Sequence, residues 1–150
     1  MHPRLRRLCY LLLTGAALGF SLQSLRSCTA TAFAPPTAAG DWKLATAPEC
    51  GKPLPADLQL WRGATAARRI CRAHYSGSPD IAVTIYEMPG GPGATAFDAL
   101  QKWQPQPGRM AFYQGDLFGV VESPDATNES LNRFILSLES QLPPGDEARR

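Results

Sequence analysis

Two cysteines and one histidine are the residues of this sequence best suited to chemistry. Cys71 follows Cys50 after 20 intervening residues, and His74 lies three positions beyond Cys71. Thiolate and imidazole bind zinc, but no fourth ligand is identifiable. Cys71 and His74 would also point to opposite faces of a strand, because they are three residues apart. We therefore predict a disulfide between Cys50 and Cys71, as is common in exported domains, and neither a metal nor a cofactor.

Acid–base chemistry would have to use His74, since the other histidine is His2, near the start of the chain. No nucleophile elbow or family cysteine motif accompanies it. Glu87 and Glu122 end two predicted strands, and they could form a carboxylate pair if those strands are neighbours. A small ligand-binding protein or a hydrolase using His74 with these strand-end carboxylates is thus one hypothesis. We assign no catalytic residue, and the sequence favours a non-enzymatic protein.

Five residues are candidates for a binding surface: Arg68, Arg72, His74, Tyr86 and Tyr113. The arginines belong to the one basic cluster of the chain, which could contact anionic lipid head groups or an acidic partner. A solvated sheet face is the simpler interpretation of that cluster. The tyrosines would contribute if one face of the sheet is left without helices.

Charge is unevenly distributed along the 150 residues. The formal net charge is +2, but four arginines lie in the first 32 residues, which contain no acid. From residue 33 onward there remain 11 basic residues against 13 acidic ones, a net charge of −2. This balance argues against nucleic-acid binding.

The first 32 residues have the features of an export signal. A basic segment, Met1–Arg7, precedes the apolar run Leu8–Phe20, and this order is typical of secretory leaders. We expect cleavage after Ala32, where small residues alternate. An uncleaved anchor over residues 8–25 is the alternative, although a membrane span needs about 20 apolar residues. Leu25-Arg-Ser-Cys28 resembles a bacterial lipobox with an atypical arginine, so lipidation of Cys28 is a further alternative.

The remaining chain divides into three predicted parts. Residues 33–56 are rich in Pro, Ala and Thr and resemble an extended tether and loop. Residues 57–142 carry the periodic patterns of a single folded domain. Residues 143–150 begin with Pro-Pro-Gly and are predicted to be a disordered tail.

The strongest strand pattern is Ile81–Met88, in which branched residues alternate with Ala, Thr and Tyr. Arg68–Tyr75 alternates in the same way, and the turn-rich segment 76–80 predicts a hairpin between the two. A second hairpin is predicted for residues 109–122, around Gln114-Gly-Asp116. Trp42 and its neighbours could form a short extra strand or an extended arm.

Two amphipathic helices are predicted. Residues 94–103 have apolar side chains at helical spacing, and residues 131–142 carry a longer apolar stripe, Leu131, Phe134, Ile135, Leu138 and Leu142. The domain therefore contains strand–strand–helix twice, and each second strand ends in Glu-x-Pro. We predict an α+β fold with an antiparallel sheet of about four to five strands and two helices on one face.

Part of the chain resembles a known class. Val83–Pro89, Ala96–Trp103 and Met110–Ser123 are similar to segments of small exported bacterial proteins that carry a domain of unknown function. The resemblance covers about half the chain and rests on hydrophobic pattern and a few aromatic residues. It implies an exported α+β module and transfers no functional residue.

These observations predict an exported, non-enzymatic module of the periplasm or cell envelope. Its partner would be a protein or an anionic membrane surface, bound through the uncovered face of the sheet.

Overall fold

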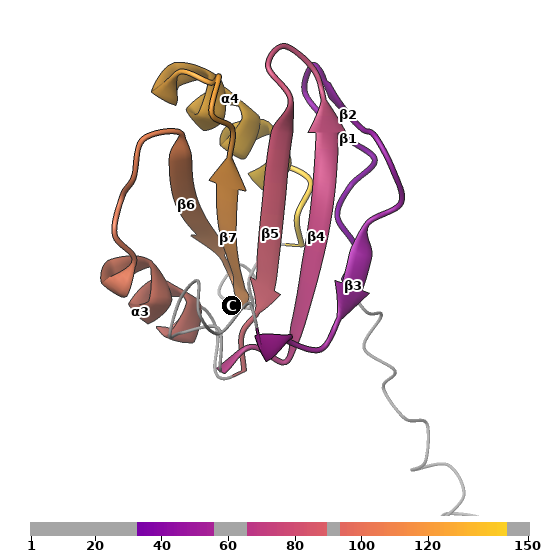
Figure 1. Cartoon of the computed structure of the whole chain (residues 1–150). Helices are drawn as coiled ribbons and strands as arrows, with labels where there is room; N and C mark the ends of the chain where they lie inside the picture. The colour runs from indigo at the N-terminus through magenta and orange to yellow at the C-terminus, as the bar shows by residue number, and fades with distance from the viewer. Residues whose placement is uncertain (1–32, 56–65, 90–93, 144–150) are drawn as a thin grey trace, which may run out of the picture. The chain divides into compact units, whose positions relative to one another are not determined.

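The computed structural model describes residues 33–55, 66–89 and 94–143. The elements follow one another in this order: β1 (Ala38–Ala39), β2 (Trp42–Leu44), β3 (Glu49–Gly51), β4 (Arg69–Ser76), β5 (Ile81–Glu87), α3 (Ala94–Lys102), β6 (Arg109–Gln114), β7 (Leu117–Glu122) and α4 (Asn128–Glu139). Figure 1 shows the strands side by side in a curved sheet, with α4 behind its upper part and α3 at its lower left. The predicted α+β class is confirmed.

The centre of the sheet is the hairpin of β4 and β5. Its register runs from Tyr75 opposite Ile81 to Arg69 opposite Glu87. Ile81, Val83 and Ile85 are each at most 2% exposed, as their period-two spacing predicts. We call the face that carries these three residues the rear face, and the face that carries Ala82, Thr84 and Tyr86 the front face.

All strand pairs are antiparallel, and the order across the sheet is β1-β2-β4-β5-β7-β6, with β3 also paired to β4. The sheet thus has seven strands, and the expected four to five is wrong. The additional strands are two or three residues long, too short to display a hydrophobic period. They lie between residues 38 and 51, in the segment expected to be a tether. The domain therefore begins well before residue 57.

The outer edge of β4 is long enough to hold two of these short strands. Lys43 and Leu44 of β2 pair with the Ser76 end, and β3 pairs with Ile70, Cys71 and Arg72 near the other end. The predicted disulfide is confirmed: Cys50 and Cys71 are cross-strand neighbours joined by an S–S bond of 2.04 Å. Since β3 buries little side-chain surface, the bridge is a principal attachment of this segment to the sheet.

Helix α4 covers the rear face. Thr127 caps it, since its hydroxyl accepts a hydrogen bond from the Ser130 amide at 3.2 Å. The predicted stripe is buried: Leu131, Phe134 and Leu138 are fully inaccessible to solvent. The Phe134 ring packs edge-on against Tyr75 at 5.1 Å and against Trp42 at 5.5 Å. Burial of the stripe stabilises the fold by on the order of 10 kcal/mol before chain entropy is subtracted.

Helix α3 covers the front face, so the prediction that both helices share one face is wrong. Ala96 and Ala99 of α3 pack in a buried cluster with Ile70, Tyr86, Met88, Phe118 and Val120. The reason lies in where each hairpin ends. Strand β5 ends on a rear-face residue, Glu87, so the next residue, Met88, points to the front and joins this cluster. Strand β7 ends on a front-face residue, Glu122, so the next residue, Ser123, points to the rear. The chain therefore leaves the two strands toward opposite faces.

The repeated Glu-x-Pro tripeptide does not mark equivalent positions. Glu87 lies opposite Leu117 on the rear face, whereas Glu122 lies opposite Ala82 on the front face. The element order is nevertheless strand–strand–helix twice. The two units thus share an order of elements but not a common placement of their helices.

Candidate binding surface on the front of the sheet

One row of residues crosses four strands of the front face. His74 is opposite Ala82, Ala82 is opposite Glu122, and Glu122 is opposite Arg109. Directly opposed residues share a face of the sheet. The registers of the two hairpins and the pairing of β5 with β7 therefore bring together three ionisable side chains that are up to 48 positions apart in the sequence.

The next row along the strands consists of Arg72, Thr84, Val120 and Ala111. Val120 of this row already belongs to the buried cluster that contains Ala96 and Ala99 of α3. Beyond the row, Ile70, Tyr86 and Phe118 are buried beneath the same helix. Helix α3 has only nine residues and covers this end alone. We call the uncovered part, made of Arg72, His74, Ala82, Thr84, Glu122 and Arg109, the open half.

A shallow depression lies at the end of the open half. Its volume is about 260 Å³, and its lining includes His74, Asp80, Glu122 and Pro124. Asp80 belongs to the β4–β5 turn, where its carboxylate accepts a hydrogen bond from the Gly77 amide at 3.0 Å. The depression therefore joins the predicted histidine to two carboxylates, one of which already holds a turn together.

The second carboxylate, that of Glu122, is engaged by Arg109. The Arg109 Nε lies 2.6 Å from Glu122 Oε1, and the two side chains are 24% and 41% exposed. Arg109 Nη1 also donates a hydrogen bond to Gln106 Oε1 at 2.9 Å. A guanidinium held on two sides orients the carboxylate as a fixed acceptor. This arrangement suits recognition of a donor group better than removal of a proton.

The hypothesis that Glu87 and Glu122 form a catalytic pair is wrong. Their strands are neighbours, but they are antiparallel, so the two residues lie at opposite ends and on opposite faces. Their positions are five residue steps apart along the strands, or roughly 16 Å. His74 and Glu122 do share the depression, but Ala82 lies between them, so their backbones are about 10 Å apart, or two strand spacings.

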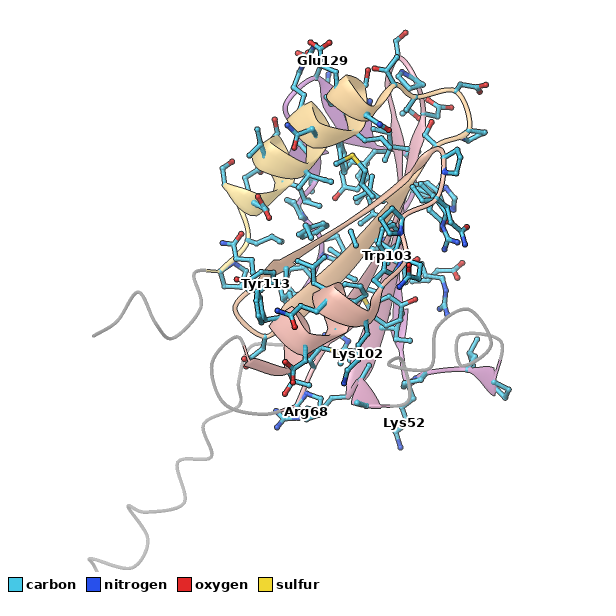
Figure 2. All side chains as sticks on the ribbon, turned by 90° about the vertical axis from the view of Figure 1, so that its left-hand side faces the viewer. Lys52, Arg68, Lys102, Trp103, Tyr113 and Glu129 are labelled. Carbon is cyan, nitrogen blue, oxygen red and sulfur yellow. A yellow bond between two sulfur atoms is a disulfide. The ribbon has the colours of Figure 1, made fainter. Side chains whose placement is uncertain are left out.

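The five predicted binding residues are dispersed. Arg72 and His74 lie in the open half, as expected for a shared surface. Arg68 is at the other end of β4, in the lower part of Figure 2, where its amide donates to the Glu87 carbonyl at 2.8 Å. Tyr86 is only 3% exposed beneath α3 and is not available to a partner. Tyr113 is 37% exposed at the β6 edge, where it packs on Phe97.

The basic cluster is divided between the two faces of the sheet. Arg72 lies on the front, whereas Arg69 lies opposite Glu87 on the rear; Arg62 is outside the described residues. Glu49 of β3 is opposite Arg72. Arginines and carboxylates are therefore interleaved on this side of the sheet, and the described residues form no continuous basic surface.

Sequence reasoning missed Thr84 and Arg109 of the open half and Asp80 at its margin. A signal for Arg109 existed in the second hairpin. Counting outward from the Gly115-Asp116 turn pairs Gln114 with Leu117 and, five residues on, Arg109 with Glu122. Only the pairing of β5 with β7, which no turn specifies, adds His74 to that row.

Two groups on the side of the sheet covered by α4, Tyr75 and Glu139, have a raised pKa. Burial raises the pKa of Tyr75 to about 12, and its hydroxyl donates a hydrogen bond to the Pro36 carbonyl at 2.8 Å. Burial also raises the pKa of Glu139, on α4. Tyr75 packs against Phe134 of α4, so its role is in the rear core.

Two further properties concern the same described ranges. Within residues 33–55, 66–89 and 94–143, no group of three or more His, Cys, Asp or Glu side chains could hold a metal ion. Neither helix of that part of the chain is long and apolar enough to span a membrane. The predicted leader and the C-terminal tail from residue 144 lie outside these ranges.

No protein-family profile, curated protein or solved structure matches the chain. The resemblance to exported proteins carrying a domain of unknown function therefore stays a prediction.

Proposed function

We propose that this protein is an exported, non-enzymatic module of the periplasm or cell envelope that binds a protein partner through the open half. The observation that carries the proposal is the incomplete cover of the front face. Helix α3 packs on the apolar end, whereas the row of His74, Ala82, Glu122 and Arg109 has no element over it among the described residues. A polar tract with an oriented ion pair suits a complementary protein surface.

The charge of the open half favours a protein over an anionic membrane. Arg72 and Arg109 are balanced by Glu122, and by Asp80 and Glu49 at its margins. Lipid head groups are bound by clusters of several lysines and arginines without interleaved acids. Alternating signs instead favour a partner whose own charges alternate in register.

Export is supported by the first 20 residues, in which a basic segment precedes an apolar one. The Cys50–Cys71 disulfide supports it as well, since disulfides persist in oxidising compartments. Intact mass of the protein recovered from the periplasm or the medium tests it. We expect a chain that has lost residues 1–32. A full-length chain in the membrane fraction would contradict cleavage, and a lipid mass on Cys28 would show the lipidated form.

Site-specific photocrosslinking tests the binding surface. A photoreactive residue in place of Thr84, in the middle of the open half, should give a discrete protein adduct in the envelope. The same residue in place of Leu136, which is 59% exposed on α4, is the matched control. Arg109→Glu should abolish the Thr84 adduct by placing two acids side by side. Equal adducts from both positions, or lipid adducts alone, would refute a protein partner at this surface.

The depression beside His74 supports a second candidate, a binding site for a small ligand. About 260 Å³ lined by an imidazole and two carboxylates could accommodate a small polar molecule or support hydrolysis. The two candidates respond differently to mutation. Loss of His74 alone should abolish ligand binding or turnover, whereas Thr84→Lys, on the flat part of the tract, should disrupt only a protein partner.

A further inference from the structure

We propose that the outer edge of β6 pairs with β6 of a second copy of this chain, so that two sheets join into one. Strand β6 ends the order of the sheet. At the opposite end, the short strands β1, β2 and β3 occupy the edge. Figure 2, which looks onto the β6 side, shows this strand running between α4 and α3. The edge is therefore flanked by both helices and lies open between them.

The backbone groups at this edge follow from the hairpin. Gly115 has a positive φ of 54°, as the first central residue of a two-residue turn of type II′ requires. Gln114 and Leu117 next to such a turn form a hydrogen-bonded pair, and pairs alternate from there. The Ser123 amide donates to the Gly108 carbonyl at 2.9 Å. Gly108 is six residues from Gln114, so it falls on a hydrogen-bonded position of the same alternation. Ala111 and Tyr113 therefore direct their amide and carbonyl groups outward.

Within the described part of the chain, the outward amide and carbonyl groups of Ala111 and Tyr113 have no hydrogen-bond partner, and only Arg109 differs. The Arg109 amide donates to the Gln106 carbonyl at 3.1 Å. Edge strands are normally protected by charge, proline or a bulge. Here the prolines, Pro105 and Pro107, precede the strand, and the only charged residue on it is Arg109, which is neutralised by Glu122.

The sequence of β6 is complementary to itself. In an antiparallel pairing centred on Ala111, each Ala111 faces the other, Met110 faces Phe112, and Arg109 faces Tyr113. The small side chain thus lies on the two-fold axis, the apolar pair lies on one face, and the cation lies opposite an aromatic ring. About four backbone hydrogen bonds would form, two from the Ala111 amides and two from the Tyr113 amides.

Exposed aromatic residues lie beside this edge. Phe97 is 42% exposed and Tyr113 is 37% exposed, and their rings meet at 5.4 Å in an edge-on arrangement. In the proposed register, these two rings of one copy would lie next to Arg109 of the other. Association would therefore bury apolar surface as well as complete the ladder. The two-fold axis would place both open halves on the same face of the joined sheet.

Disulfide trapping tests the register directly. The full chain would carry Cys9→Ser and Cys28→Ser, so that an engineered cysteine is the only one outside the Cys50–Cys71 bridge. Ala111→Cys should give a covalent dimer on mild oxidation, because opposed residues of a ladder have Cα atoms about 5.5 Å apart. Tyr113→Cys should not, since the two copies of residue 113 would lie roughly 13 Å apart.

Two controls separate this pairing from other association. Thr84→Cys, on the same face but two strands from the edge, reports random collision. The apolar run Leu8–Phe20 could also associate the chains, so the decisive readout is position-specific trapping rather than mass alone. Preferential trapping at residue 111 supports the proposal. Equal trapping at positions 84 and 111, no trapping at 111, or preferential trapping at 113 would overturn it.

A proline variant supplies an independent test. Ala111→Pro removes only an outward amide and leaves the β6–β7 ladder its hydrogen bonds. It should weaken dimerisation at least about tenfold. Two of the shared hydrogen bonds would be lost, and the proline rings of the two copies would collide at the two-fold axis. Tyr113→Lys, which charges the edge, should act in the same direction. If both variants retain native circular dichroism and the full dimer fraction, the proposal is wrong. Arg109 is not varied, because it also belongs to the open half.

Discussion

The two faces of the sheet differ in how completely they are covered, and the difference separates stability from recognition. The rear face is apolar from Trp42 to Phe112, and α4 lies along it with three fully buried side chains. The front face is apolar only at the end beneath α3. At its other end lies a row of histidine, glutamate and arginine, in which the Glu122 and Arg109 side chains are 41% and 24% exposed. We infer that the rear face stabilises the fold, whereas residues of the open half contribute little to stability and are available for recognition.

Removal of the Phe134 ring should have the largest effect. Phe134 is fully buried between Trp42 and Tyr75, so Phe134→Ala should lower the free energy of unfolding by about 3–5 kcal/mol. Chemical denaturation followed by tryptophan fluorescence measures the change. Leu136→Ala, on the exposed side of the same helix, should change it by less than about 0.5 kcal/mol. Similar costs for the two variants would mean that α4 is not packed on the sheet.

Loss of the disulfide should have the next largest effect. The Cys50–Cys71 bridge spans a sequence separation of 21 residues, and the paired variant Cys50→Ala with Cys71→Ala should cost about 2–4 kcal/mol. Urea midpoints of the wild type with and without reductant provide the comparison. An unchanged midpoint on reduction would show that β3 needs no covalent attachment to the sheet.

The buried tyrosine of the rear face should make stability depend on alkaline pH. Because burial raises the pKa of Tyr75 from 10.0 to about 12, the unfolded chain loses this proton first as pH rises. The stabilisation is therefore complete below about pH 10 and is lost as pH approaches 12.

Tyr75→Phe sharpens that measurement. It should lower stability at neutral pH by about 1 kcal/mol, through loss of the hydrogen bond to Pro36, and it should flatten the decline between pH 10 and 12. Thermal melts over a pH series distinguish the two effects. A decline of equal slope in the variant would assign the alkaline transition to another group.

Changes in the open half should affect stability least. The Arg109–Glu122 pair is partly exposed, so Glu122→Gln should cost no more than about 1 kcal/mol. Arg109→Gln and the double variant complete a cycle that isolates the coupling between the two side chains. A coupling above about 2 kcal/mol would contradict the difference between the two faces, because the front row would then also stabilise the fold.

Much of the domain was predictable because its patterns are local. Three whole turns of α4 display their apolar stripe, so Leu131, Phe134 and Leu138 were identified correctly as core. The strand from Ile81 was identified from strict alternation, and both hairpins from turn composition. The short strands β1 and β3 were not identified, since two or three residues cannot show a period. β3 is held by the edge of β4 and by the disulfide, both of which are long-range, and β1 pairs with β2.

The candidate surface was predictable only in part. His74 and Arg72 belong to it, but Tyr86 was expected on an uncovered face and is buried. That error follows from the assignment of both helices to one face. A shift of one residue at the strand end sends α3 to the front rather than the rear, and hydrophobic periodicity within each strand carries no information about that exit.

The sequence alone predicted the α+β class, the disulfide partners, the main strands and the buried stripe of α4. Each of these depends on residue type and on spacing within one element or one pair. Tertiary structure alone decided which helix covers which face and which side chains share the open half. Both outcomes depend on the antiparallel register between β5 and β7, two strands that belong to different hairpins. Packing across the whole sheet selects that register, and no local spacing encodes it.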